Sequence, residues 1–162
     1  MPQYVQLPAG VQLLPITGGP VSFSAVSSYT SPVWSPGQYS EITVCLRVDS
    51  GTATSVDLTL VGLGGAYKSA IYYTAAGTVN FGAAWTIGGT IPYNNVAICR
   101  IAKGGIRGLR GTWCGPDGLG VGNPLYAFQG GHNTDTTSDV TGFVLTFAGG
   151  NATGVVTAWG MP

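Results

Sequence analysis

The sequence predicts an all-β protein, a single-domain antiparallel β-sandwich or jelly roll with an extended N-terminal arm. Three observations support this fold class. Apolar and polar residues alternate in several segments, as they do in strands that bury one face. Turn-forming residues recur about every 8–12 residues, a spacing typical of sandwiches. No segment shows the 3.6-residue periodicity of an amphipathic helix, and the abundant Gly, Thr, Val and Ile are poor helix formers.

Residues 1–20 form the predicted arm, and residues 21–162 form the predicted sandwich domain. Proline recurs throughout the arm and excludes a helix or a central strand there. The arm either lies on a neighbouring subunit, for example by strand addition, or packs on its own domain. Its apolar anchors are Tyr4, Val5, Leu7, Leu13 and Leu14.

The clearest strand signal follows the arm. Every even position from Ile42 to Val48 is apolar, which indicates a half-buried strand. A turn is expected at 49–51, and residues 55–60 repeat the alternation. The complete set of predicted strands is 41–48, 55–60, 66–75, 78–81, 96–101, 106–113, 125–128, 141–147 and 153–159.

The last two predicted strands have the same character. Phe143, Leu145 and Phe147 alternate with smaller residues, so they are expected on one face. Asn151, with two glycines before it, predicts the turn of a hairpin between these strands.

Charged residues make up only 7% of the chain, and six Lys and Arg balance six Asp and Glu. A disordered chain needs low hydrophobicity and high net charge, and a non-specific nucleic-acid binder needs surplus cations, so both classes are excluded. A net charge near zero promotes self-association. We therefore expect a protein whose surface is covered by other subunits, through interfaces that resemble a domain core.

The cellular context follows from the N-terminus and the cysteines. No secretory signal is visible, and the longest apolar stretches are far shorter than the ~20 residues of a membrane span. Cys45, Cys99 and Cys114 contain no Cys-x-x-Cys pair. This pattern favours three free thiols in a reducing cytoplasm, and one disulfide with one free thiol is the alternative.

No pattern of catalytic or metal-binding residues stands out. The spacing of His132, the only histidine, from Asp135 and Asp139 matches no standard metal site. A Ser-His-Asp triad would need the same histidine, and the chain lacks a Gly-x-Ser-x-Gly elbow. The single glutamate, Glu41, lies on a regular strand, and nothing indicates paired carboxylates for glycoside hydrolysis. We predict a non-enzymatic protein without metal or cofactor.

Four of the six cations lie between positions 100 and 110, with no acid between Asp57 and Asp117. One interpretation is a charged edge hairpin that blocks unwanted strand pairing. The other is an electrostatic contact with an acidic partner surface. Four cations are too few for duplex nucleic acid. The cluster consists of Arg100, Lys103, Arg107 and Arg110.

The aromatic residues leave two interpretations open. Tryptophans beside strands and turns can offer flat faces to sugar rings, or they can fill the core or an interface. The four tryptophans are Trp34, Trp85, Trp113 and Trp159.

The C-terminal segment 139–162 resembles the closing hairpin of small virion proteins of tailed bacteriophages. That hairpin has a strand, a Gly/Asn turn, then Thr-Gly, alternating apolar residues, an aromatic residue and Gly. Tail fibres more often have Tyr where this chain has Trp159. The matching residues are Phe143, Leu145, Phe147, Gly150, Asn151, Thr153, Gly154, Val156, Trp159 and Gly160.

This resemblance implies a structural role in a phage virion. The first hypothesis is a capsid decoration or cement protein, a homotrimer on the capsid surface that clamps the major capsid protein against internal DNA pressure. In that role the arm would bridge neighbours, and Arg107 and Arg110 would pair with capsid acids. The second hypothesis is a tail or baseplate receptor-binding protein that recognises cell-surface carbohydrate.

Overall fold

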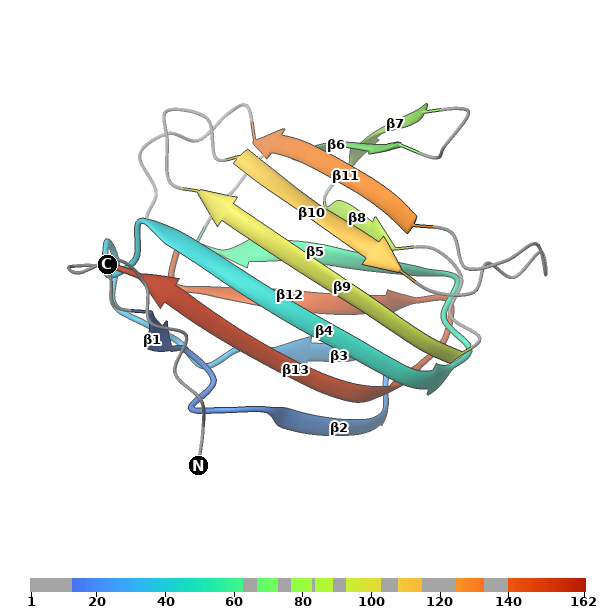
Figure 1. Cartoon of the computed structure of the whole chain (residues 1–162), viewed down its shortest axis with the longest axis horizontal. Coiled ribbons are helices and arrows are strands. Elements are labelled where there is room, and N and C mark those ends of the chain that lie inside the picture. The colour runs from blue at the N-terminus through green and yellow to red at the C-terminus, as the bar shows by residue number, and fades with distance from the viewer. Residues whose placement is uncertain are drawn as a thin grey trace.

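The computed structural model describes residues 13–62, 67–72, 77–82, 84–88, 93–102, 108–114, 125–132 and 140–162. Within these ranges the chain forms strands and no helix. The strands make two antiparallel sheets that pack together (Figure 1). The prediction of an all-β sandwich is therefore confirmed, and the jelly-roll connectivity stays a prediction.

The larger sheet contains nine strands. They are β1 (Leu14–Pro15), β2 (Val21–Val26), β4 (Glu41–Gly51), β6 (Tyr67–Tyr72), β7 (Gly77–Gly82), β9 (Tyr93–Ala102), β10 (Gly108–Cys114), β11 (Leu125–His132) and β13 (Ala152–Met161). Their order is β1-β13-β4-β9-β10-β11-β6-β7, and β2 also pairs with β13. The strands β4, β13 and β9 therefore lie inside the sheet and carry its longest ladders.

The smaller sheet contains four strands in the order β3-β12-β5-β8. These strands are β3 (Ser28–Thr30), β5 (Ser55–Val61), β8 (Trp85–Gly88) and β12 (Gly142–Ala148). Its inner face packs on that of the larger sheet and makes one apolar core.

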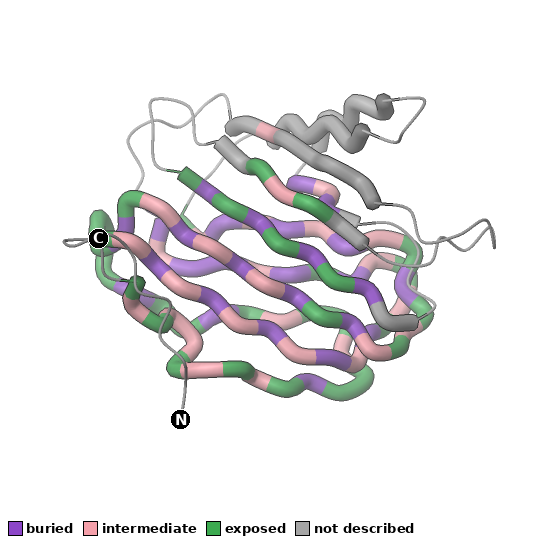
Figure 2. Tube along the Cα trace, in the orientation of Figure 1, coloured by how far each residue is buried: buried purple, intermediate pink, exposed green. Residues whose placement is uncertain are grey.

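The alternation in the sequence matches the burial in the structure. Along β4 the even positions from Ile42 to Val48 are buried, and Val56, Leu58 and Leu60 are buried along β5. Figure 2 shows this alternation as a regular change of colour along the strands. Phe143, Leu145 and Phe147 share the inner face of β12, as predicted.

The predicted hairpin at Asn151 is wrong. β12 and β13 belong to different sheets, so the turn at 149–151 carries the chain across the sandwich (Figure 1). The predicted turn at 49–51 is also wrong, because β4 continues to Gly51 and residues 52–54 form the crossing to β5.

The two crossings lie side by side and are hydrogen-bonded to each other. The Thr52 N–H donates to the Asn151 carbonyl at 2.9 Å, and the Thr54 N–H donates to the Ala148 carbonyl at 2.8 Å. Asn151 returns a bond from its own N–H to the Thr52 hydroxyl. A hairpin would leave the apolar faces of β12 and β13 in one sheet, whereas the crossing lets them face each other across the core.

Four short strands were not predicted, namely β1, β2, β3 and β8. Two of them, β8 and β2, show a short alternation of apolar and polar residues in the sequence. Trp85 and Ile87 are both fully buried on the inner face of β8, with Thr86 between them facing outward. Val21 and Phe23 alternate in the same way at the start of β2. The segments are only 4 and 6 residues long, which is too short for a strong periodic pattern.

Asn95 is an exception in the core. It lies on the inner face of β9, is completely buried, and neither its Oδ1 nor its Nδ2 has a hydrogen-bond partner. Its register partner is the buried Val48 of β4. A buried polar group without a partner costs about 1–3 kcal/mol.

We predict that the variant Asn95→Leu is more stable than the wild-type chain. Leu has the same number and branching of side-chain heavy atoms and removes the unsatisfied amide. The free energy of unfolding should rise by about 1 kcal/mol or more, and the thermal midpoint by roughly 2–4 °C. Thermal unfolding followed by circular dichroism measures the change.

Asn95→Asp is the matched control, because it keeps the size and adds a buried charge. This variant should be less stable than wild type at neutral pH. Equal or lower stability of Asn95→Leu would contradict the prediction.

Candidate functional site

The outer face of the larger sheet brings together two of the four clustered cations. Arg100 on β9 and Arg110 on β10 are register partners, so their side chains lie directly opposite each other on this face. Both residues are exposed. Lys103 and Arg107, the other two members of the cluster, lie outside the described residues. The cluster in the sequence therefore becomes, in its described part, a cross-strand pair of like charges.

Arg100 has an acidic partner within the chain. Its Nη2 lies 2.6 Å from Oε1 of Glu41, and its Nε donates to the same oxygen at 3.0 Å. On the same face Arg47 pairs with Asp49 at 2.8 Å. Within the described residues Arg110 has no ion pair. Among the side chains that the structure describes, this face thus carries two neutralised pairs and one cation, Arg110, without an acidic partner.

Two exposed apolar side chains precede Arg100 on the same face of β9. Ile98 is 44% exposed and Val96 is 41% exposed, although both lie in the middle of a long strand. Ile98 is opposite Thr112 in the register. We call Val96, Ile98, Arg100, Arg110 and Thr112 the β9–β10 patch.

The apolar part of the patch was missed from sequence. The signal was the run Val96-Ala97-Ile98-Cys99, in which both faces of the strand are apolar. Ala97 and Cys99 point into the core, so Val96 and Ile98 are left on the outside. A strand with two apolar faces is normally covered on both sides.

The described end of the arm packs on its own domain. Leu14 pairs with Gly160 of β13 through β1, and the Ile16 N–H donates to the Ala158 carbonyl at 2.9 Å. Leu13 stays 40% exposed. The anchors Tyr4, Val5 and Leu7 lie outside the described residues.

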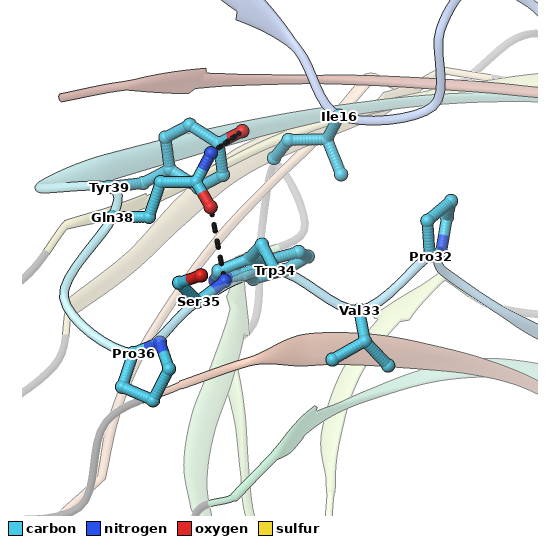
Figure 3. Close-up of a pocket in the computed structure, with 8 residues that line it drawn as sticks. All are labelled: Ile16, Pro32, Val33, Trp34, Ser35, Pro36, Gln38 and Tyr39. Carbon is cyan, nitrogen blue, oxygen red and sulfur yellow. Dashed lines mark hydrogen bonds between the residues drawn. The ribbon is translucent and has the colours of Figure 1, made fainter.

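A hollow of about 500 Å³ lies where β3 joins β4 (Figure 3). A tight turn closes one side of it, with Gly37 at a φ of +73° and a bond from the Gln38 N–H to the Ser35 carbonyl. Gln38 also accepts from the Ser35 N–H and donates to the Tyr39 hydroxyl. The lining residues are Ile16, Pro32, Val33, Trp34, Ser35, Pro36, Gln38 and Tyr39. No charged residue lines the hollow.

The aromatic side chains that line this hollow, Trp34 and Tyr39, make packing and hydrogen-bond contacts within the fold. Trp34 is only 7% exposed, and its indole N–H donates to the Val140 carbonyl at 2.8 Å. Tyr39 lies against the backbone of β13 at Gly160, where a Cβ would overlap its ring. Trp85 is fully buried, Trp159 is half-buried, and the side chain of Trp113 is not described. Among the described tryptophans, Trp159 alone is left as a partly open surface for sugar stacking.

The structure adds little support for the metal site or for a disulfide between the described cysteines. Within the described part of the chain, no three His, Cys, Asp or Glu residues are grouped to hold a metal ion. Asp135 and Asp139, and the side chain of His132, are not described. Cys45 and Cys99 are free thiols on opposite faces of the larger sheet. Burial raises the pKa of both thiols.

The outer face of the smaller sheet is rich in hydroxyl groups and carries one acid. Asp57 on β5 lies in register between Thr146 of β12 and Thr86 of β8. Its Oδ1 is buried without a hydrogen-bond partner. Burial raises the pKa of Asp57, and a hydrogen bond from Thr86 partly opposes this rise.

The comparisons with known proteins found no relative. No family model matches the chain, and neither a curated protein nor a solved structure matches it. In the ranges that the structure describes, no helix is long and apolar enough to span a membrane.

We predict that Asp57→Asn stabilises the chain at neutral pH. The pKa of folded Asp57 is raised, so ionisation opposes folding; this cost is complete above the folded pKa and absent below the unfolded pKa. The thermal midpoint of the variant should exceed that of wild type at pH 7. The difference should shrink as the pH falls through the folded pKa and vanish below about 3.9, the ordinary pKa of Asp. Thermal unfolding across pH measures it.

Asp49→Asn is the control, because it removes the same charge from an exposed surface ion pair. It should change the midpoint little at pH 7. A stabilisation by Asp57→Asn that persisted unchanged at low pH would contradict the assignment to ionisation.

Proposed function

We propose that this chain is a non-enzymatic structural component of a bacteriophage virion. In this proposal it is a decoration or cement protein that docks on the lattice of the major capsid protein and stabilises it. The charge-poor, neutral composition, the β-sandwich and the resemblance of the C-terminal segment to phage virion proteins support the proposal.

One observation carries the proposal. The β9–β10 patch exposes Ile98 and Val96 on a face where, apart from Arg110, the charged side chains that the structure describes are already paired within the chain. Covering such a face removes apolar area from water, which gains roughly 25 cal/mol per Å². The paired charges reduce the desolvation cost of covering it. The face is therefore suited to a protein–protein contact.

The arm supplies a second contact in this proposal. Its described end is held on β13, through the pairing of β1 and the bond from the Ile16 N–H. Tyr4, Val5 and Leu7 would then add apolar contact area on a neighbouring subunit. The homotrimer stays a prediction, which sedimentation equilibrium of the purified chain would test.

We predict that the purified chain sediments with phage shells that lack it and is present in hundreds of copies per particle. Deleting residues 1–10 should abolish this binding, because the anchors on the neighbour are lost. Quantitative gels of purified particles and co-sedimentation measure the two quantities.

A variant with Tyr4, Val5 and Leu7 all replaced by Ser is the matched control for the deletion. It keeps the length of the arm and removes its apolar contacts, so it should also lose most binding. A wild-type chain that binds no shell would overturn the proposal. A few dozen copies per particle, together with binding to host cells, would favour the receptor-binding hypothesis instead.

A further inference from the structure

The β9–β10 patch contains an electrostatic imbalance. Residues directly opposite each other on adjacent antiparallel strands have Cβ atoms about 4.5–5.5 Å apart, and like charges in such a pair are destabilising. Arg100 and Arg110 form such a pair. Glu41 forms an ion pair with Arg100 and not with Arg110. Arg110 is exposed and has no carboxylate partner among the described residues.

The residues around Arg110 indicate which chemical groups a partner surface must carry. Arg100 is its cross-strand neighbour, and the exposed Ile98 follows on the same face of β9. Ile98 is opposite Thr112, two residues along β10 from Arg110, so a surface that covers Ile98 also reaches the Arg110 side chain. Burial of an unpaired charge is costly, so that surface must bring a carboxylate. The guanidinium presents its donors in a planar fork that binds a carboxylate through two parallel bonds.

Among the described residues, a second copy of this chain offers no unpaired carboxylate from the same face. Glu41 and Asp49 are the acids of this face in the described residues, and both are already paired with arginine. Asp57 lies on the other sheet, with one carboxylate oxygen buried. Nucleic acid is also a poor complement, because the patch combines one unneutralised cation with exposed Ile98 and Val96.

We infer that Arg110, with Ile98 diagonally opposite on β9 and Val96 beyond it, is the specificity element of a docking surface for a different protein, one that presents a carboxylate within an apolar surface. This inference rests on the proposed function, in which that protein is the major capsid subunit. Arg110 fixes the position of the partner through a paired carboxylate, and the two aliphatic side chains supply the buried area.

The test is co-sedimentation of variants with phage shells that lack the chain, over a range of protein concentrations. Arg110→Gln should bind at least about 30-fold more weakly than wild type, since truncating one member of a buried charge pair has an effect of this size or larger. Arg110→Glu should bind more weakly still. Ile98→Thr should also weaken binding, and raised salt should weaken wild type more than Arg110→Gln.

Two variants on the smaller sheet are matched controls. Thr30→Glu changes the net charge by the same amount as Arg110→Gln, and Val144→Thr makes a similar change of apolar character to Ile98→Thr. Both positions lie on the outer face of the smaller sheet, Thr30 on β3 and Val144 on β12. Neither control should change binding. Removal of Arg110 relieves a like-charge repulsion, so thermal unfolding should show that Arg110→Gln keeps the wild-type fold and stability.

The outcomes are distinct. Wild-type binding together with selective loss in the Arg110 and Ile98 variants supports the inference. Wild-type binding that persists in Arg110→Gln and Arg110→Glu overturns the inference and leaves the proposed function standing. An equal loss in Thr30→Glu overturns it too, because net charge would then explain the result. Failure of the wild-type chain to bind any shell overturns both.

Discussion

The contact between the inner faces of the two sheets is the constraint on which the other features depend. β4 pairs with β13 in the larger sheet, β5 pairs with β12 in the smaller one, and the crossings at 52–54 and 149–151 lie side by side at one end of these strands. The hydrogen-bonded crossings fix the register of these four strands together. A slip by one residue would turn every inner side chain to solvent. The outer positions of β4 and β9, including the patch, are therefore set by the core.

Two glycines of the C-terminal segment, Gly154 and Gly160, have packing reasons in this fold. A Cβ at Gly154 would overlap the Arg47 carbonyl of the adjacent strand, beside the irregularity in the β13–β4 register. A Cβ at Gly160 would overlap the ring of Tyr39. Both positions require glycine because backbone or ring lies too close for any side chain. Strand packing therefore accounts for Gly154 and Gly160. The functional proposal has to rest on residues of the outer surface.

Local patterns were predictable from the sequence, and long-range pairings were not. The alternation from Ile42 to Val48 predicts a strand because burial of one face leaves a direct trace in sequence. Whether the turn at Asn151 closes a hairpin or crosses the sandwich depends on which strands its neighbours meet, and no local signal records this. The cluster of four cations could be recognised from the sequence alone. The opposition of Arg100 and Arg110 and the pairing with Glu41 depend on register, and Glu41 is 59 residues away.

Threonine residues at outward-facing strand positions explain how the chain keeps a polar surface with so few charged residues. Thr43 and Thr157 occupy outer positions on the larger sheet, and Thr59 and Thr146 occupy them on the smaller sheet. Threonine is β-branched, so it favours strands, and its hydroxyl keeps the surface polar. Covering a hydroxyl costs about 1–3 kcal/mol, whereas covering an ion costs several kcal/mol even after relaxation. A face built this way can be exposed or covered at moderate cost. Against such a uniform background, Arg110 would give the β9–β10 patch its selectivity in the proposed contact.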